Sequence, residues 1–124
     1  MNDKDNQIAI VLDWKKNRIR IYKETLYQIG QPDNICLLVN PEIMTIAVQA
    51  TPCSVGVTHK LNWKKLQGAR SIELYSRAFL SRLFNMKLDW DIEHSYRIYG
   101  KVNHRMNVAE FKIADAVSID DLND

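Results

Sequence analysis

The chain has few of the residues on which phosphate loops, disulfide frameworks and paired metal sites depend. Its 124 residues include only four glycines, two cysteines and three histidines. Four glycines leave little material for a glycine-rich loop that cradles phosphates. The cysteines, Cys36 and Cys53, are too few for a disulfide framework. Cys36 lies in an apolar run, where a cysteine is usually a small buried residue without a disulfide.

Metal-ligand and nucleophile patterns are also missing. The candidate ligands are Cys36, Cys53, His59, His94 and His104. No two of them have the spacing of paired zinc ligands, and the chain contains no Gly-x-Ser-x-Gly elbow. We therefore expect no catalytic residues, no metal and no cofactor, and we do not expect an enzyme.

Long apolar runs are absent as well. No stretch approaches the length of a membrane-spanning helix, and residues 1–7 lack the apolar segment of a signal peptide. We expect a cytoplasmic protein that does not contact membranes. The net charge is +2, but residues 115–124 contain four aspartates and no lysine or arginine, so residues 1–114 carry +6. A mildly basic body permits nucleic-acid binding, although an ordinary solvated surface has the same composition.

Hydrophobic periodicity predicts one domain at residues 8–114, between a polar N-terminus (1–7) and an acidic tail (115–124). Its first part, residues 8–50, is predicted as a hairpin, a short helix and a second hairpin. The expected elements are strands at Ile8–Leu12 and Arg18–Tyr22, a helix at Lys23–Ile29 that Gly30 ends, and strands at Ile35–Val39 and Thr45–Gln49.

The second part, residues 57–114, repeats this order after a segment with Pro52 and Gly56. Its expected elements are strands at Val57–Leu61 and Ser71–Tyr75, a helix at Arg77–Met86 with Phe79, Leu80, Leu83 and Phe84 on its apolar face, and strands at Ser95–Val102 and Val108–Ile113. Asn62–Lys65 matches the basic turn at Asp13–Lys16, since both contain Trp-Lys-Lys. A repeated order of elements indicates an internal duplication.

The first part resembles the AbrB/SpoVT family of bacterial regulators. The matching positions are Asp13, Arg18, Ile19, Ile21, Leu26, Ile29 and Gly30, followed by the strands at 35–39 and 45–48. Two copies in one chain resemble the MraZ branch. The resemblance implies an α+β fold of mainly antiparallel strands, in which duplicated hairpin-helix-hairpin units form a swapped-hairpin-like barrel with two short helices. A clamp-like barrel, as in DNA sliding clamps, is the alternative.

The positive charge of the two matching turns indicates where nucleic acid would bind. The candidate residues are Lys15, Lys16, Arg18, Arg20, Lys64, Lys65 and Arg70. Lysines contact phosphates and arginines also read base edges, but both residues favour exposed turns in any protein. Trp14 and Trp63 could stack on bases, although a tryptophan beside a strand more often closes the end of a core.

These patterns predict a small regulator that binds double-stranded DNA through basic turns. The alternative is a protein-interaction module or inhibitor carried by a bacterial mobile element, which would bind a nucleic-acid-handling protein and use the acidic tail to imitate phosphates. A homo-oligomer is compatible with either function.

Overall fold

The computed structural model describes residues 8–50, 57–87 and 89–119. Its elements are β1 (Ile8–Asp13), β2 (Arg18–Tyr22), α1 (Lys23–Gln28), β3 (Asn34–Asn40), β4 (Thr45–Gln49), β5 (Val57–Lys60), α2 (Trp63–Leu66), β6 (Ser71–Tyr75), α3 (Arg77–Met86), β7 (Ser95–Asn103), β8 (Val108–Lys112), the 3₁₀ helix η2 (Ile113–Asp115) and β9 (Val117–Ile119). All strand pairs are antiparallel, so the predicted class, α+β with mainly antiparallel strands, is confirmed.

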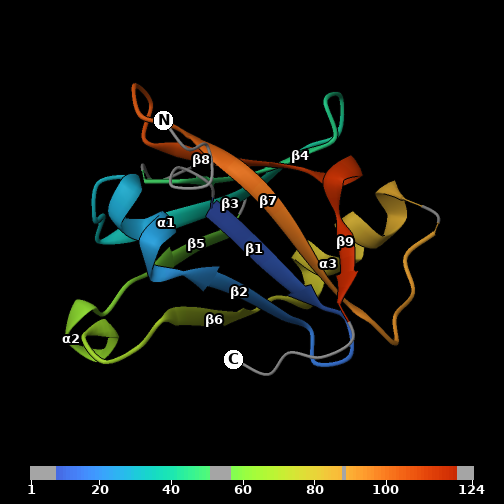
Figure 1. Ribbon diagram of the computed structural model, residues 1–124, viewed down its shortest axis with the longest axis horizontal. Coiled ribbons are helices and arrows are strands. Elements are labelled where there is room, and N and C mark those ends of the chain that lie inside the picture. Colours follow the sequence, from blue (N-terminus) through green and yellow to red (C-terminus); the bar gives the residue numbers. More distant parts are fainter. Residues whose placement is uncertain (1–7, 51–56, 88, 120–124) are drawn as a thin grey trace.

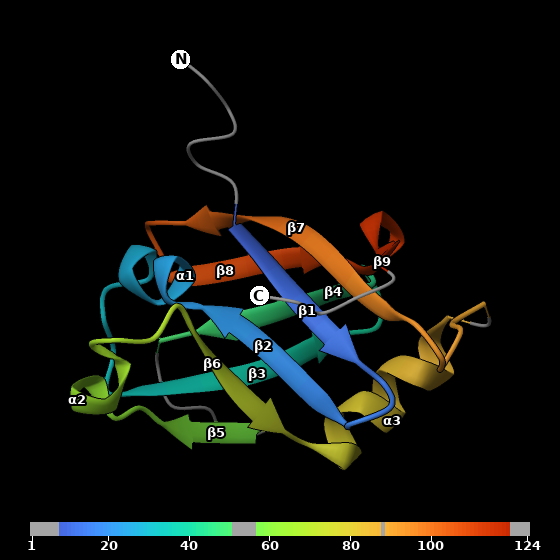
Figure 2. The same ribbon diagram turned by 60° about the horizontal axis from the view of Figure 1, so that its bottom comes forward.

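The strands form one nine-stranded sheet that curls into a half-barrel (Figure 1). Eight strands follow the order β5-β3-β4-β8-β7-β1-β2-β6, and β9 pairs with β7. Within the described residues, β5 and β6 are the two ends of this order and do not pair with each other. Helices α1 and α2 lie at one end of the half-barrel and α3 lies at the other (Figure 2). Each end therefore has its own helical cover.

Alternating strand residues face inwards and form the core, because successive side chains of a strand point to opposite faces. The strands contribute Ile8, Ile10, Leu12, Ile19, Ile21, Ile35, Leu37, Ile46, Val48, Ile98 and Phe111, all at most 3% exposed. Leu26 of α1 and Phe79, Leu80 and Leu83 of α3 add to this core. The prediction for α3 is confirmed in its bounds and wrong in one residue, because Phe84 is 43% exposed.

Three hairpins have the same four-residue loop. The closing pairs are Asp13↔Arg18, Asn40↔Thr45 and Asn103↔Val108. In each loop the last residue has a positive φ: 51° at Asn17, 49° at Met44 and 54° at Asn107. The strand residue just before each loop is Asp or Asn, and its side-chain oxygen accepts a hydrogen bond from a backbone N–H two or three residues later. Short polar side chains of this kind stabilise turns by binding their own backbone.

The two halves share an order of elements from β2 and β6 onwards. Each continues as strand, helix and hairpin, β2-α1-β3-β4 in the first half and β6-α3-β7-β8 in the second. Two of the three corresponding strand pairs are neighbours, since β2 pairs with β6 and β4 pairs with β8, whereas β3 and β7 are separated by β4 and β8. The halves differ before that point. β1 pairs with β2, whereas β5 pairs with β3, and α2 lies between β5 and β6 in the chain.

Aromatic rings fill the end of the core beside α3. Trp14 is 9% exposed, and its ring centroid lies 5.1 Å from that of Trp90 and 5.8 Å from that of Phe84. The Trp90 Nε1–H donates to the Leu83 carbonyl oxygen at 2.9 Å, so its polar atom is satisfied in the apolar surroundings. Trp14 therefore packs in the core at one end of the half-barrel, the more common of its two predicted roles.

Two features differ from expectation. The segment assigned to an acidic tail contains β9, which pairs with β7 through Ser95↔Ile119 and Arg97↔Val117. Cys36 is fully buried, as predicted, but it is disulfide-bonded. The only other cysteine of the sequence, Cys53, lies outside the described residues. An apolar neighbourhood could not indicate the disulfide, because buried thiols and buried disulfides occupy similar surroundings.

His59 of β5 makes stability depend on pH. Its ring is half-buried, and Nε2 has no hydrogen-bond partner among the described residues. Burial lowers the pKa of this imidazole below its ordinary value of 6.5. The unfolded chain then binds the proton more readily than the folded chain. The contribution of His59 to stability is therefore complete above the unfolded pKa and decreases as pH falls through it.

We expect the free energy of unfolding to be lower at about pH 5.5 than at about pH 7.5. Urea unfolding at the two pH values measures the difference. His59→Gln removes the titrating group, so this variant should lose less stability on acidification than the wild type. An equal loss in both proteins would contradict the role of His59.

Candidate nucleic-acid interface

The β1–β2 turn carries the first pair of predicted lysines. The Asp13 carboxylate accepts a hydrogen bond from the Lys16 backbone N–H at 3.3 Å, which fixes the turn and leaves both lysine side chains exposed. The Lys15 ammonium lies 3.1 Å from the Glu93 carboxylate, with side chains 60% and 69% exposed. An ion pair this exposed contributes little and exchanges readily. Both lysines are therefore accessible to an anionic partner.

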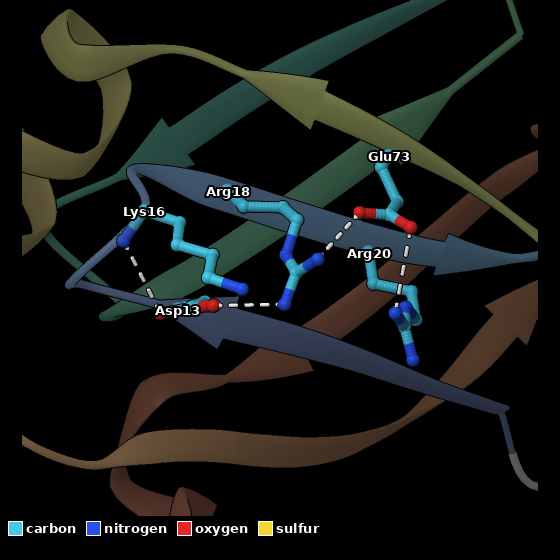
Figure 3. Close-up of polar contacts among 5 residues, drawn as sticks. All are labelled: Asp13, Lys16, Arg18, Arg20 and Glu73. Atoms are coloured by element: carbon cyan, nitrogen blue, oxygen red, sulfur yellow. Dashed lines mark hydrogen bonds and ion pairs between the residues drawn. The ribbon is translucent and has the colours of Figure 1, made fainter. Parts of the chain in front are cut away.

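Arg18 and Arg20 take part in an ion-pair network on the outside of the sheet (Figure 3). Arg18 lies 2.9 Å from Asp13 and 2.8 Å from Glu73, and Arg20 lies 3.4 Å from Glu73. Their side chains are only 13% and 8% exposed. Because Glu73 is on β6 and both arginines are on β2, the network reinforces the pairing of these strands.

The surroundings of Arg18 stabilise its charged form. Burial alone would lower the pKa of its guanidinium, but the hydrogen bonds and charges of Glu73 and Asp13 outweigh burial and raise that pKa. Two carboxylates face two guanidinium groups, so most of the positive charge here is compensated inside the protein. Contact between these two arginines and phosphate stays a prediction, and the geometry gives them a structural role as well.

The second predicted turn is a helix. Asn62 is the N-cap of α2, and its side chain accepts a hydrogen bond from the Lys65 N–H at 3.3 Å. The Trp63 Nε1–H donates to the Pro32 carbonyl oxygen at 2.8 Å, and the Trp63 ring centroid lies 5.7 Å from that of Tyr27. These contacts hold α2 against α1 and leave Lys64 and Lys65 exposed on the outer side.

The α2 end of the half-barrel has the larger uncompensated positive charge. Four exposed cations lie on β5, on α2 and in the connection to β6: Lys60, Lys64, Lys65 and Arg70. None of them has an ion-pair partner among residues 8–50, 57–87 and 89–119. The exposed acidic residues of the neighbouring segments are Glu24 and Asp33. We call the four cations the α2-end cluster.

Lys60 was missing from the sequence prediction because it precedes the repeated Trp-Lys-Lys triplet and has no counterpart in the first turn. The structure also does not bring the two basic segments together. The β1–β2 turn lies at the α3 end and α2 lies at the opposite end (Figure 2). A partner that contacts both segments must therefore extend along the half-barrel.

The described residues supply no metal centre. No group of three His, Cys, Asp or Glu side chains in that part of the chain lies close enough together to hold a metal ion. None of the described helices has the length and apolar character needed to cross a membrane. The chemistry that the α2 end does present is exposed positive charge beside two aromatic rings.

Comparisons with known proteins give no relative. No family model, no curated protein and no solved structure matches the chain.

Proposed function

We propose that the protein binds nucleic acid through the α2-end cluster, with Lys15 and Lys16 as a second contact, and that it acts as a small DNA-binding regulator. The observation that carries the proposal is the contrast between the two groups of predicted cations. Arg18 and Arg20 face carboxylates, whereas the cluster has none within ion-pair distance in the described part of the chain. Exposed cations without internal partners are the groups that phosphates attract.

The geometry also supports an extended ligand. The cluster and the β1–β2 turn lie at opposite ends of the half-barrel, so a duplex that contacts both would run along the face formed by β2 and β6 (Figure 2). Six exposed lysines and arginines would then reach phosphates: Lys15, Lys16, Lys60, Lys64, Lys65 and Arg70. Each contact releases a counterion, so binding should weaken steeply with salt.

We also propose that the fold arose by duplication, as the resemblance to the MraZ branch implies. Two observations support this proposal. The hairpins β3–β4 and β7–β8 share loop length, an Asn just before the loop and the position of the positive φ. Six of the seven neighbour pairs in the strand order are also kept when each strand of the first half is exchanged for its counterpart in the second, and the exception is β1–β2, because β5 and β6 do not pair among the described residues. A duplicated scaffold would offer two related but separate contact regions.

The proposed function predicts binding to labelled double-stranded DNA at low salt. Fluorescence anisotropy at several salt concentrations measures the affinity. With about six phosphate contacts, log K should fall against log salt with a slope of about −5. A small acidic protein at the same concentrations is the control for adventitious signal. If no duplex of any sequence binds at low salt, the proposal is wrong.

A protein-interaction module is the second candidate, and the α3 end favours it. Phe84 and Ile92 are 43% and 53% exposed, and they line a hollow of about 330 Å³ together with Trp14 and Leu80. Exposed apolar groups around a concave surface are typical of protein contacts. Capture of one defined partner from nuclease-treated extract, and its loss in Phe84→Ser, would support this candidate. Deletion of residues 120–124 removes the terminal aspartates and keeps all residues of β9, so it tests whether these aspartates contribute to binding of the protein partner.

A further inference from the structure

A hollow between α1 and α2 lies directly beside the α2-end cluster. It has a volume of about 370 Å³ and is lined by Tyr27, Gln31, Trp63, Leu66 and Gln67. This volume is within the range of small-molecule sites, and the hollow is open to solvent on one side. Its lining residues combine two aromatic rings, one leucine and two carboxamides.

Several contacts hold the hollow in a fixed shape. Trp63 is anchored by its hydrogen bond to the Pro32 carbonyl oxygen at 2.8 Å. The Lys23 ammonium bridges α1 and α2, because it donates to the carbonyl oxygens of Leu66 at 2.8 Å and Gln67 at 3.3 Å. The same ammonium lies 5.9 Å from the centroid of the Tyr27 ring. The rings are therefore positioned before any ligand arrives, which lowers the entropy lost on binding.

The polar groups of the hollow are available to a ligand. Gln31 and Gln67 are exposed, and their side-chain amides have no hydrogen-bond partner among the described residues. A carboxamide offers both donors and an acceptor, which is the pattern needed for the polar edge of a nucleobase. Tyr27 is 44% exposed, so part of its ring is open to contact.

We propose that this hollow accepts an unpaired nucleobase of single-stranded nucleic acid while the α2-end cluster contacts the flanking phosphates. The inference rests on the proposed function and extends it to a class of ligand. The base would contact the rings of Tyr27 and Trp63, with its polar edge within reach of Gln31 and Gln67. Charge complementarity favours this occupant, because helix α2 carries both Trp63 of the hollow and the exposed Lys64 and Lys65, which have no ion-pair partner in the described part of the chain.

Base pairing decides which strand can enter. In a duplex the faces of each base are stacked and its Watson–Crick edge is paired, so neither is free to contact rings or carboxamides. In a single strand both are free. The cluster attracts phosphates of either form, whereas the hollow adds affinity only for unpaired bases. Single strands should therefore bind more tightly than duplexes of the same sequence and length.

The test compares a single strand of about 12 nucleotides with its duplex by fluorescence anisotropy at constant salt. Tyr27→Ala should weaken binding of the single strand roughly tenfold, because stacking on one aromatic side chain is lost. Binding of the duplex should stay unchanged. The double variant Gln31→Ala/Gln67→Ala should also weaken binding of the single strand and leave binding of the duplex unchanged. The control is Tyr99→Ala, since Tyr99 is exposed to a similar degree, at 47%, but lies on β7 opposite Ala9, away from the hollow and from the β2–β6 face.

An abasic single strand provides a measurement on the unaltered protein. It retains the phosphates and lacks the bases, so it should bind the wild type about as weakly as the normal strand binds Tyr27→Ala. Equal affinity for abasic and normal strands, or an equal effect of Tyr27→Ala on duplex and single strand, would overturn the base site and leave the proposed function intact. Absence of binding to every nucleic acid would overturn both.

Discussion

Replacing Gly100 with alanine is expected to destabilise the protein by about 3 kcal/mol or more. Gly100 faces Phe111 across the β7–β8 pair. A Cβ atom at position 100 would lie 2.5 Å from Cδ1 and 2.9 Å from Cε1 of the Phe111 ring, and closer still to the backbone carbonyl oxygen of Glu110. The Phe111 ring is fully buried and the carbonyl belongs to a paired strand, so neither can move without disturbing the core.

Gly68 provides the matched control. An added Cβ at that position meets no atom within 4 Å, and the residue does not have a positive φ. Gly68→Ala should leave stability unchanged or raise it slightly, because alanine restricts the unfolded chain. Urea unfolding of both variants at neutral pH measures the difference in midpoint. A Gly100→Ala protein as stable as the wild type would contradict the packing of β7 against β8.

Removing three charges of the α2-end cluster should have the largest effect on nucleic-acid binding. In the variant Lys64→Ala/Lys65→Ala/Arg70→Ala, we expect the affinity for duplex DNA to fall at least tenfold at about 0.1 M salt. Since each phosphate contact contributes about −0.9 to the slope of log K against log salt, the slope should become shallower by roughly 2.7. All three side chains are exposed and without ion pairs in the described chain, so folding should be unaffected.

The control removes the same number of charges elsewhere. Lys101, Arg105 and Lys112 are exposed on β7, on the β7–β8 loop and on β8. Their triple alanine variant has the same net charge as the cluster variant. It should keep most of the affinity and nearly the whole salt slope. If the two variants lose the same affinity, binding follows net charge alone and the cluster is not a site.

Local patterns predicted most strands and hairpins because alternation and turn chemistry act over a few residues. The turn at Asp13 and the helix at Asn62 show where such patterns stop being sufficient. In both segments the first side chain accepts a hydrogen bond from the backbone N–H three residues later, at 3.3 Å. The same local bond thus begins a hairpin turn in one case and a helix in the other. What differs is tertiary, because Trp63 packs on Tyr27 while Trp14 packs in the core beside α3.

The candidate site was harder to predict than the strands, because contacts between residues distant in sequence decide which cations are free to bind a partner. Lys64 belongs to one Trp-Lys-Lys triplet and Arg18 follows the other by two positions, so the sequence gives no reason to distinguish them as surface cations. Only the pairing of β2 with β6 brings Glu73 to Arg18, across 55 positions. The hollow beside α2 likewise combines residues of two helices far apart in the chain. β9 was missed because its three residues have too little alternation to predict a strand within an acidic segment.

Backbone amide chemical shifts of the isotope-labelled protein, recorded during titration with single-stranded DNA, would locate the nucleic-acid contact residue by residue. We expect the largest shift changes at residues 60–70, which contain the α2-end cluster, and at residues 23–31 of α1 and its C-terminal loop. Residues 101–112 should change little. Shifts confined to the α3 end, around Phe84 and Ile92, or no shifts at any salt concentration, would contradict this expectation.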